Sequence, residues 1–303
     1  MVSRVEITVS ENERKMRLED LLCSRFPALS KMYLREVVKN GDCELNGRHE
    51  NRGKRVLPQD FVEVNVDLTR QHSMLPQDIP LDIVFEDADL IVVNKPSGML
   101  VHPSHCEKNG TLLNAVVYHL QKPDREAGLN AQGGSYAANV RASAIRPGLI
   151  HRLDKDTSGL IVIARNSRAH RILGLQFHNK KVDKRYVALV DGVVVKDQGE
   201  IVGNIGRNAE AKWWELREDG KHAMTRYHVI ERREHTTLLE LEPVTGRTNQ
   251  LRIHCAGLGH PIVGDTMRGG SANRRMCLHS ARLSFRLPSS GEQLDLASTP
   301  DFI

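Results

Sequence analysis

The sequence contains few cysteines and no C-x-x-C pair. There are five of them, Cys23, Cys43, Cys106, Cys255 and Cys277. An odd number without paired spacing argues against a disulfide framework and is typical of a reducing compartment. Histidines lie near three of these cysteines, but tetrahedral zinc sites show tighter, repeated spacing. We therefore expect no metal site.

The chain also lacks a long hydrophobic run, an internal repeat and a nucleotide-binding glycine loop. The longest apolar run, 160–164, has about five residues, whereas a membrane-spanning helix needs about 20. The polar N-terminus, MVSRVEITVSENERK, does not resemble a signal peptide. Neither G-x-G-x-x-G nor G-K-[ST] occurs. We expect a cytoplasmic protein with no membrane partner.

What the chain does have is an ordinary globular composition with an excess of positive charge. Its 303 residues are 40% hydrophobic and 27% charged, enough for one large domain and a smaller one. The formal net charge of +5 gives a first, weak indication of a partner that carries phosphates, such as nucleic acid.

The first 75 residues predict a small α+β module. Alternating valines and isoleucine predict strands over 5–9 and 62–66, and Asn46-Gly47 predicts a tight turn. Apolar residues at helical spacing predict one helix over 18–26 and another that Ser30 caps and Gly41 closes.

Basic residues lie on both of these helices. They are Arg17, Arg25, Lys31, Arg35 and Lys39. A solvated face would explain them, but the stretches RLEDLL, FPALSKMYLREVVKNG, LNG and VLPQDFVEV resemble the small RNA-binding module first known from ribosomal small-subunit protein four. The resemblance implies that Arg17, Lys31 and Arg35 bind RNA. A polar stretch, 67–79, is typical of a linker.

The remainder of the chain alternates many strands with few helices, which favours an α+β domain around a mixed sheet. Helical spacing predicts a helix from a Thr111 cap, another over 167–182, and a third capped by Thr248. Between the first two, residues 121–146 are rich in Gly, Ala, Ser and Asn. We expect a flexible insertion there, one that substrate binding could order.

The stretch PGLIHRLDKDTSGLIVIARN, 147–166, interrupts apolar residues with a dense polar block. It fits either a surface turn or an active-site loop. Gly159 permits a sharp turn before the following strand, and Thr157 and Ser158 can bond to the loop backbone. Asp154 and Asp156 should point in different directions, which disfavours hydrolysis by two close carboxylates.

A single carboxylate can still act as a nucleophile, since it is ionised at neutral pH. It needs positioning, which a bidentate arginine supplies well. Three arginines are available, namely Arg152 in the same loop and Arg247 or Arg252 in GRTNQLRIH. Such a set, without a cofactor, suits attack on an electrophilic carbon of a base ring or a sugar.

The same loop, HRLDKDTSGLIVIARN, resembles the signature of ribosomal large-subunit pseudouridine synthases of the RluA/RluD type. Supporting stretches follow in the family's order: NKPSGMLVHP, GTLLNAVVYHL, KRYVALVDG, TGRTNQLRIH and GHPIVGD. The resemblance implies an α+β, mostly antiparallel, mixed-sheet catalytic domain over 76–303, after an RNA-binding module and linker over 1–75. It implies an RNA uridine isomerase that uses no cofactor and acts on large-subunit rRNA.

The resemblance also implies roles for single residues. Asp154 matches the catalytic aspartate, and Arg152 matches the arginine that enters the RNA stack when the target uridine flips out. Tyr186 matches the tyrosine that packs on the flipped uracil, and Arg252 matches the basic partner of the aspartate. We place Arg247 among the RNA-binding residues. Position 249 is Asn, where the family usually has His, and we expect this change to tune the loop.

Other interpretations stay open at this point. The chain could be a non-catalytic RNA-binding or ribosome-assembly protein, a carboxylate-dependent hydrolase, or a synthase that acts on tRNA. A basic run is expected to follow RNA phosphates, through Arg165, Arg168, Arg171, Lys180, Lys181, Lys184 and Arg185. The chain is expected to be a monomer. Trp213 and Trp214 are adjacent, so at least one should be exposed if they lie in a strand.

Overall fold

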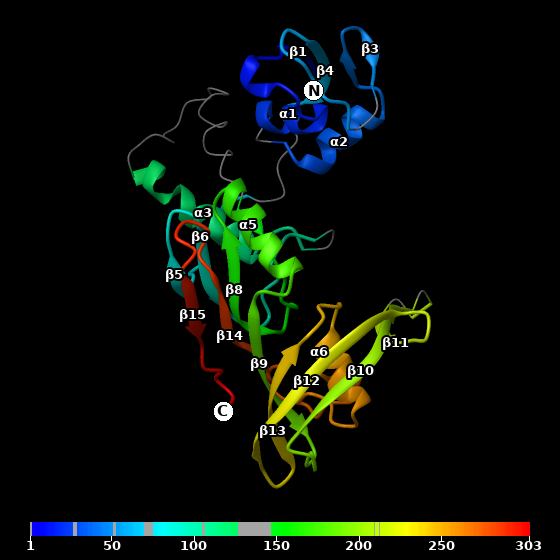
Figure 1. Cartoon of the computed structure of the whole chain (residues 1–303), viewed down its shortest axis with the longest axis vertical. Helices are drawn as coiled ribbons and strands as arrows, with labels where there is room; N and C mark the ends of the chain where they lie inside the picture. Colours follow the sequence, from blue (N-terminus) through cyan, green and yellow to red (C-terminus); the bar gives the residue numbers. More distant parts are fainter. Residues whose placement is uncertain are drawn as a thin grey trace. The chain divides into compact units, whose positions relative to one another are not determined.

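The chain divides into two units (Figure 1). The computed structural model describes residues 2–26, 29–50, 53–69, 75–104, 107–126, 147–208, 210–211 and 213–303. The N-terminal unit is built mainly from residues 1–77, and the C-terminal unit from residues 78–104, 110–116 and 147–303. Among the described residues, no helix is long and apolar enough to cross a membrane.

The N-terminal unit contains a four-stranded antiparallel sheet. Its strands, in spatial order, are β1 (Val2–Thr8), β4 (Phe61–Asp67), β2 (Cys43–Leu45) and β3 (Arg48–His49). The two predicted strands are confirmed as parts of β1 and β4. Asn46 and Gly47 join β2 to β3 with φ angles of 53° and 71°. This left-handed pair confirms the predicted turn.

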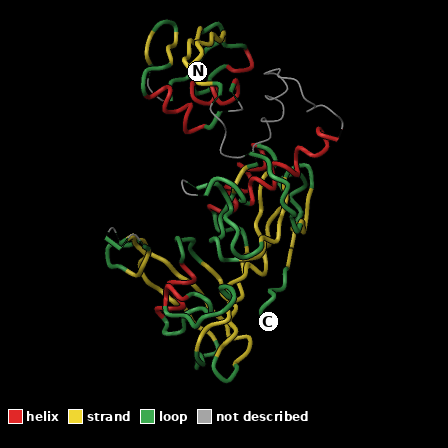
Figure 2. Tube along the Cα trace, turned by 180° about the vertical axis from the view of Figure 1, so that it is seen from behind, coloured by secondary structure: helices red, strands yellow, loops and turns green. Residues whose placement is uncertain are grey.

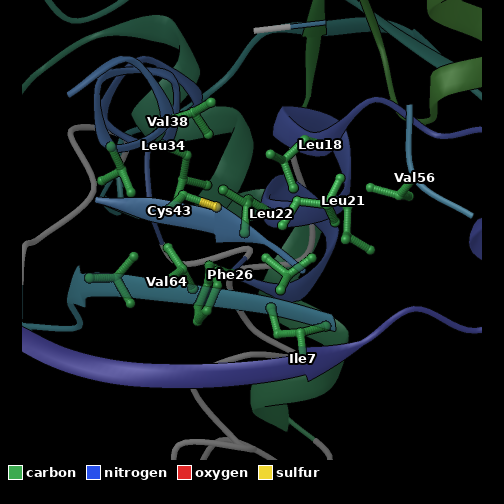
Figure 3. Packing of buried hydrophobic residues seen from close by; sticks show 14 of the residues in the cluster. Ile7, Leu18, Leu21, Leu22, Phe26, Leu34, Val38, Cys43, Val56 and Val64 are labelled. Atoms are coloured by element: carbon green, nitrogen blue, oxygen red, sulfur yellow. The ribbon is translucent and has the colours of Figure 1, made fainter. Parts of the chain in front are cut away.

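Two helices cover the core of this unit. They are α1 (Leu18–Arg25) and α2 (Lys31–Lys39), and a short 3-10 turn, η1 (Glu11–Glu13), precedes them. The predicted Ser30 cap is confirmed, because its hydroxyl accepts from the backbone N–H of Tyr33 at 3.1 Å. Leu18, Leu34 and Val64 are among the buried side chains that join the helices to the sheet (Figure 3). Both predicted helices therefore form, with their apolar faces inward.

The C-terminal unit is organised around one large sheet (Figure 1). The main path, in spatial order, is β11 (Trp214–Leu216), β10 (Gln198–Arg207), β12 (Lys221–Arg232), β13 (Thr236–Pro243), β9 (Asp183–Asp191), β14 (Leu278–Arg286), β8 (Ser158–Ala164), β6 (Leu90–Lys95) and β5 (Ile83–Glu86). Two more strands are attached, β15 (Gln293–Ala297) beside β14 and β7 (Gly148–Leu149) beside β8. Seen from behind, strands and loops make up most of this unit (Figure 2).

The centre of this sheet places two distant segments side by side. Among the described strands, β8 and β14 pair in parallel, and the other pairs are antiparallel. Ser280 of β14 stands opposite Gly159 of β8 on one side and opposite Tyr186 of β9 on the other. The loop that precedes β8 is therefore brought next to β9. The sheet is mixed and mostly antiparallel, as predicted.

Two helices pack on this sheet within the described residues, α5 (Ser167–His178) against β8 and α6 (Gln250–Gly257) against β10, β12 and β13. The chain also forms α3 (Leu112–Glu126) and, beside α6, the 3-10 turn η2 (Thr266–Arg268). The insertion was predicted to begin at residue 121, but α3 continues to Glu126, so the predicted start is wrong. Residues 127–146 lie outside the described residues. The Thr248 cap is wrong: the N-cap of α6 is Asn249, which makes no side-chain cap bond.

Candidate active site

A buried lysine holds the polar loop in place. Lys95, at the end of β6, is fully buried, and its ammonium donates to the carbonyls of Pro96, Met99 and Lys155 at 2.8–2.9 Å. Burial lowers the pKa of Lys95 to about 8. Three carbonyl acceptors satisfy its donors, and one belongs to the 150–157 loop. Lys95 is thus a structural anchor, and its neighbours in the sequence gave no sign of this role.

Gly159 lets β8 approach β14 closely. Its φ is +107°, and a Cβ there would lie 2.4 Å from the carbonyl oxygen of Ser280. The predicted turn before the strand is wrong in position, because Gly159 lies inside β8, where its positive φ and the close approach of β14 both favour glycine. Ser158 does not serve the loop backbone as predicted. Its buried hydroxyl instead pairs with Nδ1 of His279 at 2.7 Å, because the parallel register places these two residues together.

The loop presents Asp154 to a cavity of about 870 Å³. The Asp154 side chain is 32% exposed, so one edge of the carboxylate is accessible. Burial raises the pKa of Asp154, while the charges of Arg252 and Arg152 act in the opposite direction. Asp156 lines a different cavity. The predicted divergence of the two carboxylates is therefore confirmed.

Arg252 of α6 is held by a residue that sequence reasoning missed. Its guanidinium makes two hydrogen bonds of 2.7 Å to Asp265, whose side chain is 1% exposed. The distance from Arg252 Nη1 to Asp154 Oδ2 is 3.8 Å. A bidentate bond from Arg252 to Asp154 is therefore absent, although the two groups form an ion pair. Asp265 lay inside the stretch GHPIVGD, where nothing in the residue pattern assigned it a role.

Tyr186 lines the same cavity from β9. It is 9% exposed, and Ser280 of β14 stands opposite it in the sheet. Burial raises the pKa of Tyr186 to about 12, so the phenol stays neutral at physiological pH. Sheet register brings this ring to the same cavity as Asp154, and the cavity wall thus carries one carboxylate and one aromatic side chain.

The segment before α6 is fixed by a buried glutamine. The Gln250 side chain accepts from the Thr245 hydroxyl at 2.7 Å and from the backbone N–H of Arg247 at 2.9 Å. It donates to the carbonyl of Met224 and to the Thr225 hydroxyl. This network secures the segment that carries Arg247 and Asn249 against β12. Gln250 is a second organising residue to which sequence reasoning gave no role.

The predicted RNA-binding arginines of the C-terminal unit both line the cavity. Arg152 is exposed on the loop, two residues before Asp154. Arg247 donates from Nε to the carbonyl of His222 at 3.0 Å. The structure thus brings Asp154, Tyr186, Arg252, Arg152 and Arg247 into one region.

The other predicted RNA contacts belong to the N-terminal unit. Arg17 is exposed just before α1, and Arg35 is exposed on α2. Lys31, the first residue of α2, forms an exposed ion pair of 2.9 Å with Asp20. Their binding to RNA stays a prediction.

The basic run 165–185 is partly neutralised by the protein itself. Arg165 pairs with Glu86 at 2.9 Å, and Arg185 pairs with Glu242 at 2.7 Å. Lys184 is half-buried with its ammonium 5.9 Å from the Phe177 ring centre. That this run follows phosphates stays a prediction. The exposed members are the best candidates, namely Arg168, Arg171, Lys180 and Lys181.

The adjacent tryptophans have structural roles. Trp214 packs against the buried cluster of Ile205, Ala223 and Ile253. Trp213 is 37% exposed and donates from its indole to Glu215 at 2.8 Å. Its ring lies 5.8 Å from the Arg268 guanidinium, within range of a cation–π contact. The expectation that one of the pair is exposed is confirmed.

Cysteines and metal ligands give no further site among the described residues. Cys43, Cys255 and Cys277 are free thiols there, and no group of three His, Cys, Asp or Glu could hold a metal ion. Cys106 lies outside the described residues. Carboxylate, guanidinium, amide and phenol groups line the cavity, together with histidine and lysine side chains.

A recessed carboxylate, a fixed arginine and a buried tyrosine on one cavity wall describe an enzyme active site in an α+β fold. Residues 89–257, which include Asp154, Tyr186 and Arg252, match the family model described as RNA pseudouridylate synthase. The chain belongs to the RNA pseudouridylate synthase family. It is therefore an isomerase that acts on RNA, and the predicted enzyme class is confirmed.

Relatives match over nearly the whole chain. An uncharacterized RNA pseudouridine synthase of Bacillus subtilis is 35% identical over 97% of this chain and 93% of its own length. Ribosomal large subunit pseudouridine synthase D of Zymomonas mobilis is 36% identical over 96% of this chain and 92% of its own.

A solved structure agrees with these matches. Human RNA pseudouridylate synthase domain containing 1 is 27% identical, with a TM-score of 0.59 over 75% of this chain and 86% of its own. The predicted fold class of the catalytic domain is therefore confirmed.

Proposed function

We propose that this enzyme converts specific uridines of large-subunit rRNA to pseudouridine, with Asp154 as its nucleophile. The observation that carries the proposal is the placement of Asp154, Tyr186 and Arg252 around one cavity of about 870 Å³. A cavity of this size accommodates a nucleotide. The substrate class is supported by relatives that are named ribosomal large subunit pseudouridine synthase D.

The reaction breaks the bond between ribose C1′ and uracil N1, rotates the base, and joins C1′ to C5. The C5 proton is lost to water and N1 takes up a proton, so that the product is an isomer of uridine. A carboxylate can hold one fragment covalently while the base turns. Burial raises the pKa of Asp154, which makes its carboxylate a better nucleophile than a fully solvated one. Asp154 can attack either the ring or the sugar under this proposal.

A uridine inside stacked RNA must leave the stack before Asp154 can reach it, which costs a few kcal/mol. Arg152 is exposed two residues away, so its planar guanidinium can occupy the vacated space. The ring of Tyr186 offers a face on which the extruded uracil can stack. Arg247, on the cavity wall, can neutralise a neighbouring phosphate.

The N-terminal unit supplies a second RNA contact under this proposal. We propose that residues 1–75 form an RNA-binding module with its linker and that residues 76–303 form the catalytic domain. Arg17, Lys31 and Arg35 are exposed and basic, as binding to phosphates requires. We propose that the protein acts in the cytoplasm, because its relatives named ribosomal large subunit pseudouridine synthase D come from bacteria, whose ribosomes lie in the cytoplasm.

The test is release of tritium from RNA labelled at uracil C5. Transcripts of large-subunit rRNA, small-subunit rRNA and tRNA are incubated separately with the full chain. We expect release from the large-subunit transcript above the other two. Release from tRNA alone would overturn the substrate class, and liberated uracil without pseudouridine would indicate a hydrolase. No release from any transcript, with RNA still bound, would favour a non-catalytic binding protein.

A further inference from the structure

The Asp154 carboxylate has an uncharged neighbour that is closer than its arginine. Arg252 Nη1 stands 3.8 Å away, too far for a hydrogen bond. The Asn249 amide faces the carboxylate, and its nitrogen lies 2.8 Å from Oδ2 and 3.3 Å from Oδ1 when it points toward them. The opposite orientation would set the amide oxygen against another acceptor. Among the described residues, Asn249 is thus the closest side-chain donor to Asp154.

The backbone conformation at Asn249 directs this amide toward Asp154. Asn249 is the N-cap of α6 and has φ 54° and ψ 22°, a left-handed conformation that asparagine tolerates better than most residues. Gln250, which follows, is 4% exposed and bonded on both sides of its amide. The backbone from which the Asn249 side chain extends is therefore held in place by its neighbour. The Asn249 amide makes no cap bond to the helix.

We propose that Asn249 is a positioning residue whose amide holds the Asp154 carboxylate, so that one carboxylate oxygen faces the cavity. The inference rests on the proposed function, in which Asp154 is the reacting group. A full ion pair would orient the carboxylate too, but it would also stabilise the anion and make it a poorer nucleophile. Here Asp265 takes both close bonds of Arg252, and a neutral amide does the orienting.

Three variants distinguish the effect of losing the amide donor from the effect of changing the backbone conformation. Asn249→Gly removes the donor and keeps an easy left-handed backbone. Asn249→Ala removes the donor and adds backbone strain. Asn249→Asp keeps the shape but replaces the donor with an acceptor. Gln59→Gly, at another left-handed position (φ 71°), controls for added chain freedom.

Positioning predicts a change in rate without a change in binding. We expect kcat of Asn249→Gly to fall roughly 10- to 100-fold, with an unchanged KM for RNA. The kcat of Asn249→Ala should fall by at least the same factor. An equal fall in the kcat of Asn249→Gly and of Gln59→Gly would overturn the inference, because added backbone freedom alone would then explain the lower kcat.

The pH profile gives a readout that a merely structural role would not move. In Asn249→Asp, two carboxylates face each other, and the proton that they share at lower pH restores a donor beside Asp154. Activity of Asn249→Asp should therefore rise as the pH falls toward 5, relative to Asn249→Gly. Parallel profiles for the two variants would contradict the inference.

A measurement on the free enzyme tests the contact without any RNA. The full chain is labelled with aspartate carrying ¹³C in its side-chain carboxyl, and the Asp154 signal is assigned by its loss in Asp154→Asn. Loss of the amide donor should raise the pKa of Asp154 by about one unit in Asn249→Gly. An unchanged pKa would overturn the inference. A raised pKa in a protein that forms no pseudouridine would support the inference and overturn the proposed function.

Discussion

Arg252 and Asp265 form a two-point ion pair beside the active-site loop, with both hydrogen bonds at 2.7 Å. The Asp265 side chain is 1% exposed and that of Arg252 12%. Such a pair fixes the plane of the guanidinium, so its remaining nitrogen faces Asp154 at a set distance of 3.8 Å. Asp265 thus sets the strength of the electrostatic interaction between Arg252 and Asp154.

Removal of this partner should be costly. Asp265→Asn removes the hydrogen-bonded counter-charge of a buried guanidinium and leaves only Asp154 at 3.8 Å, so we expect the free energy of unfolding to fall by roughly 3–5 kcal/mol. Urea unfolding followed by circular dichroism measures this loss. Asp301→Asn is the matched control, since Asp301 also pairs with two arginines but is 53% exposed. The control should lose at most about 1 kcal/mol, and equal losses would contradict the argument from burial.

The close approach of β8 to β14 predicts a second stability difference. Gly159→Ala would force a Cβ to 2.4 Å from the Ser280 carbonyl oxygen, at a φ of +107°. We expect a loss of roughly 3 kcal/mol or more. Gly174→Ala on α5 meets nothing within 4 Å and should gain up to about 1 kcal/mol from helix propensity. A mild effect at Gly159 would show that the strands can separate.

Buried histidines predict a loss of stability in mild acid. Burial lowers the pKa of His151 to about 3 and the pKa values of His254 and His279 to about 4. In the unfolded chain each titrates near 6.5, so below that pH the unfolded state binds more protons. The free energy of unfolding should fall with pH, by roughly 1 kcal/mol per pH unit for each histidine, between pH 6.5 and about 4.

Urea unfolding at several pH values tests this linkage. His254→Gln should shrink the slope between pH 6.5 and pH 5, because one buried imidazole no longer has to stay neutral. His235→Gln, at a side chain that is 85% exposed, is the control and should leave the slope unchanged. Equal slopes in wild type and His254→Gln would contradict the assignment.

Tyr186 predicts a difference between losing a hydroxyl and losing a ring. Tyr186→Phe removes the phenol hydroxyl but keeps the aromatic face in the cavity wall, and activity should largely persist. Tyr186→Leu removes the face on which uracil would stack and should lower kcat/KM roughly ten-fold or more. Steady-state tritium release from the rRNA transcript distinguishes the two. A greater loss in Tyr186→Phe would mean that the hydroxyl itself reacts.

The active-site loop could be found from sequence because its polar residues are contiguous and Gly159 marks its end. The partners of these residues could not be found in this way. Three arginines were compatible with an ion pair to Asp154, and spacing alone did not reveal that Asp265 takes both close bonds of Arg252. The pairing of Ser158 with His279 depends on the parallel register of β8 and β14, which only the folded sheet sets.

The start of α6 shows the same limit at a smaller scale. Thr248 has good capping chemistry, so the pattern favoured it over its neighbour. The helix instead begins after Asn249, whose left-handed backbone frees the amide for Asp154. The sequence likewise did not predict that buried Lys95 and Gln250 hold loop segments in place, because their acceptors come from segments distant in the chain.

The most direct test of Asp154 as the nucleophile compares two neighbouring aspartates. Tritium release from C5-labelled large-subunit rRNA is measured for wild type, Asp154→Asn and Asp156→Asn, with circular dichroism as the check on folding. Asp154 lines the cavity shared with Tyr186, whereas Asp156 lines another. We predict release by wild type and Asp156→Asn and none by folded Asp154→Asn. Release by Asp154→Asn at the wild-type rate would contradict the assignment of Asp154 as the nucleophile.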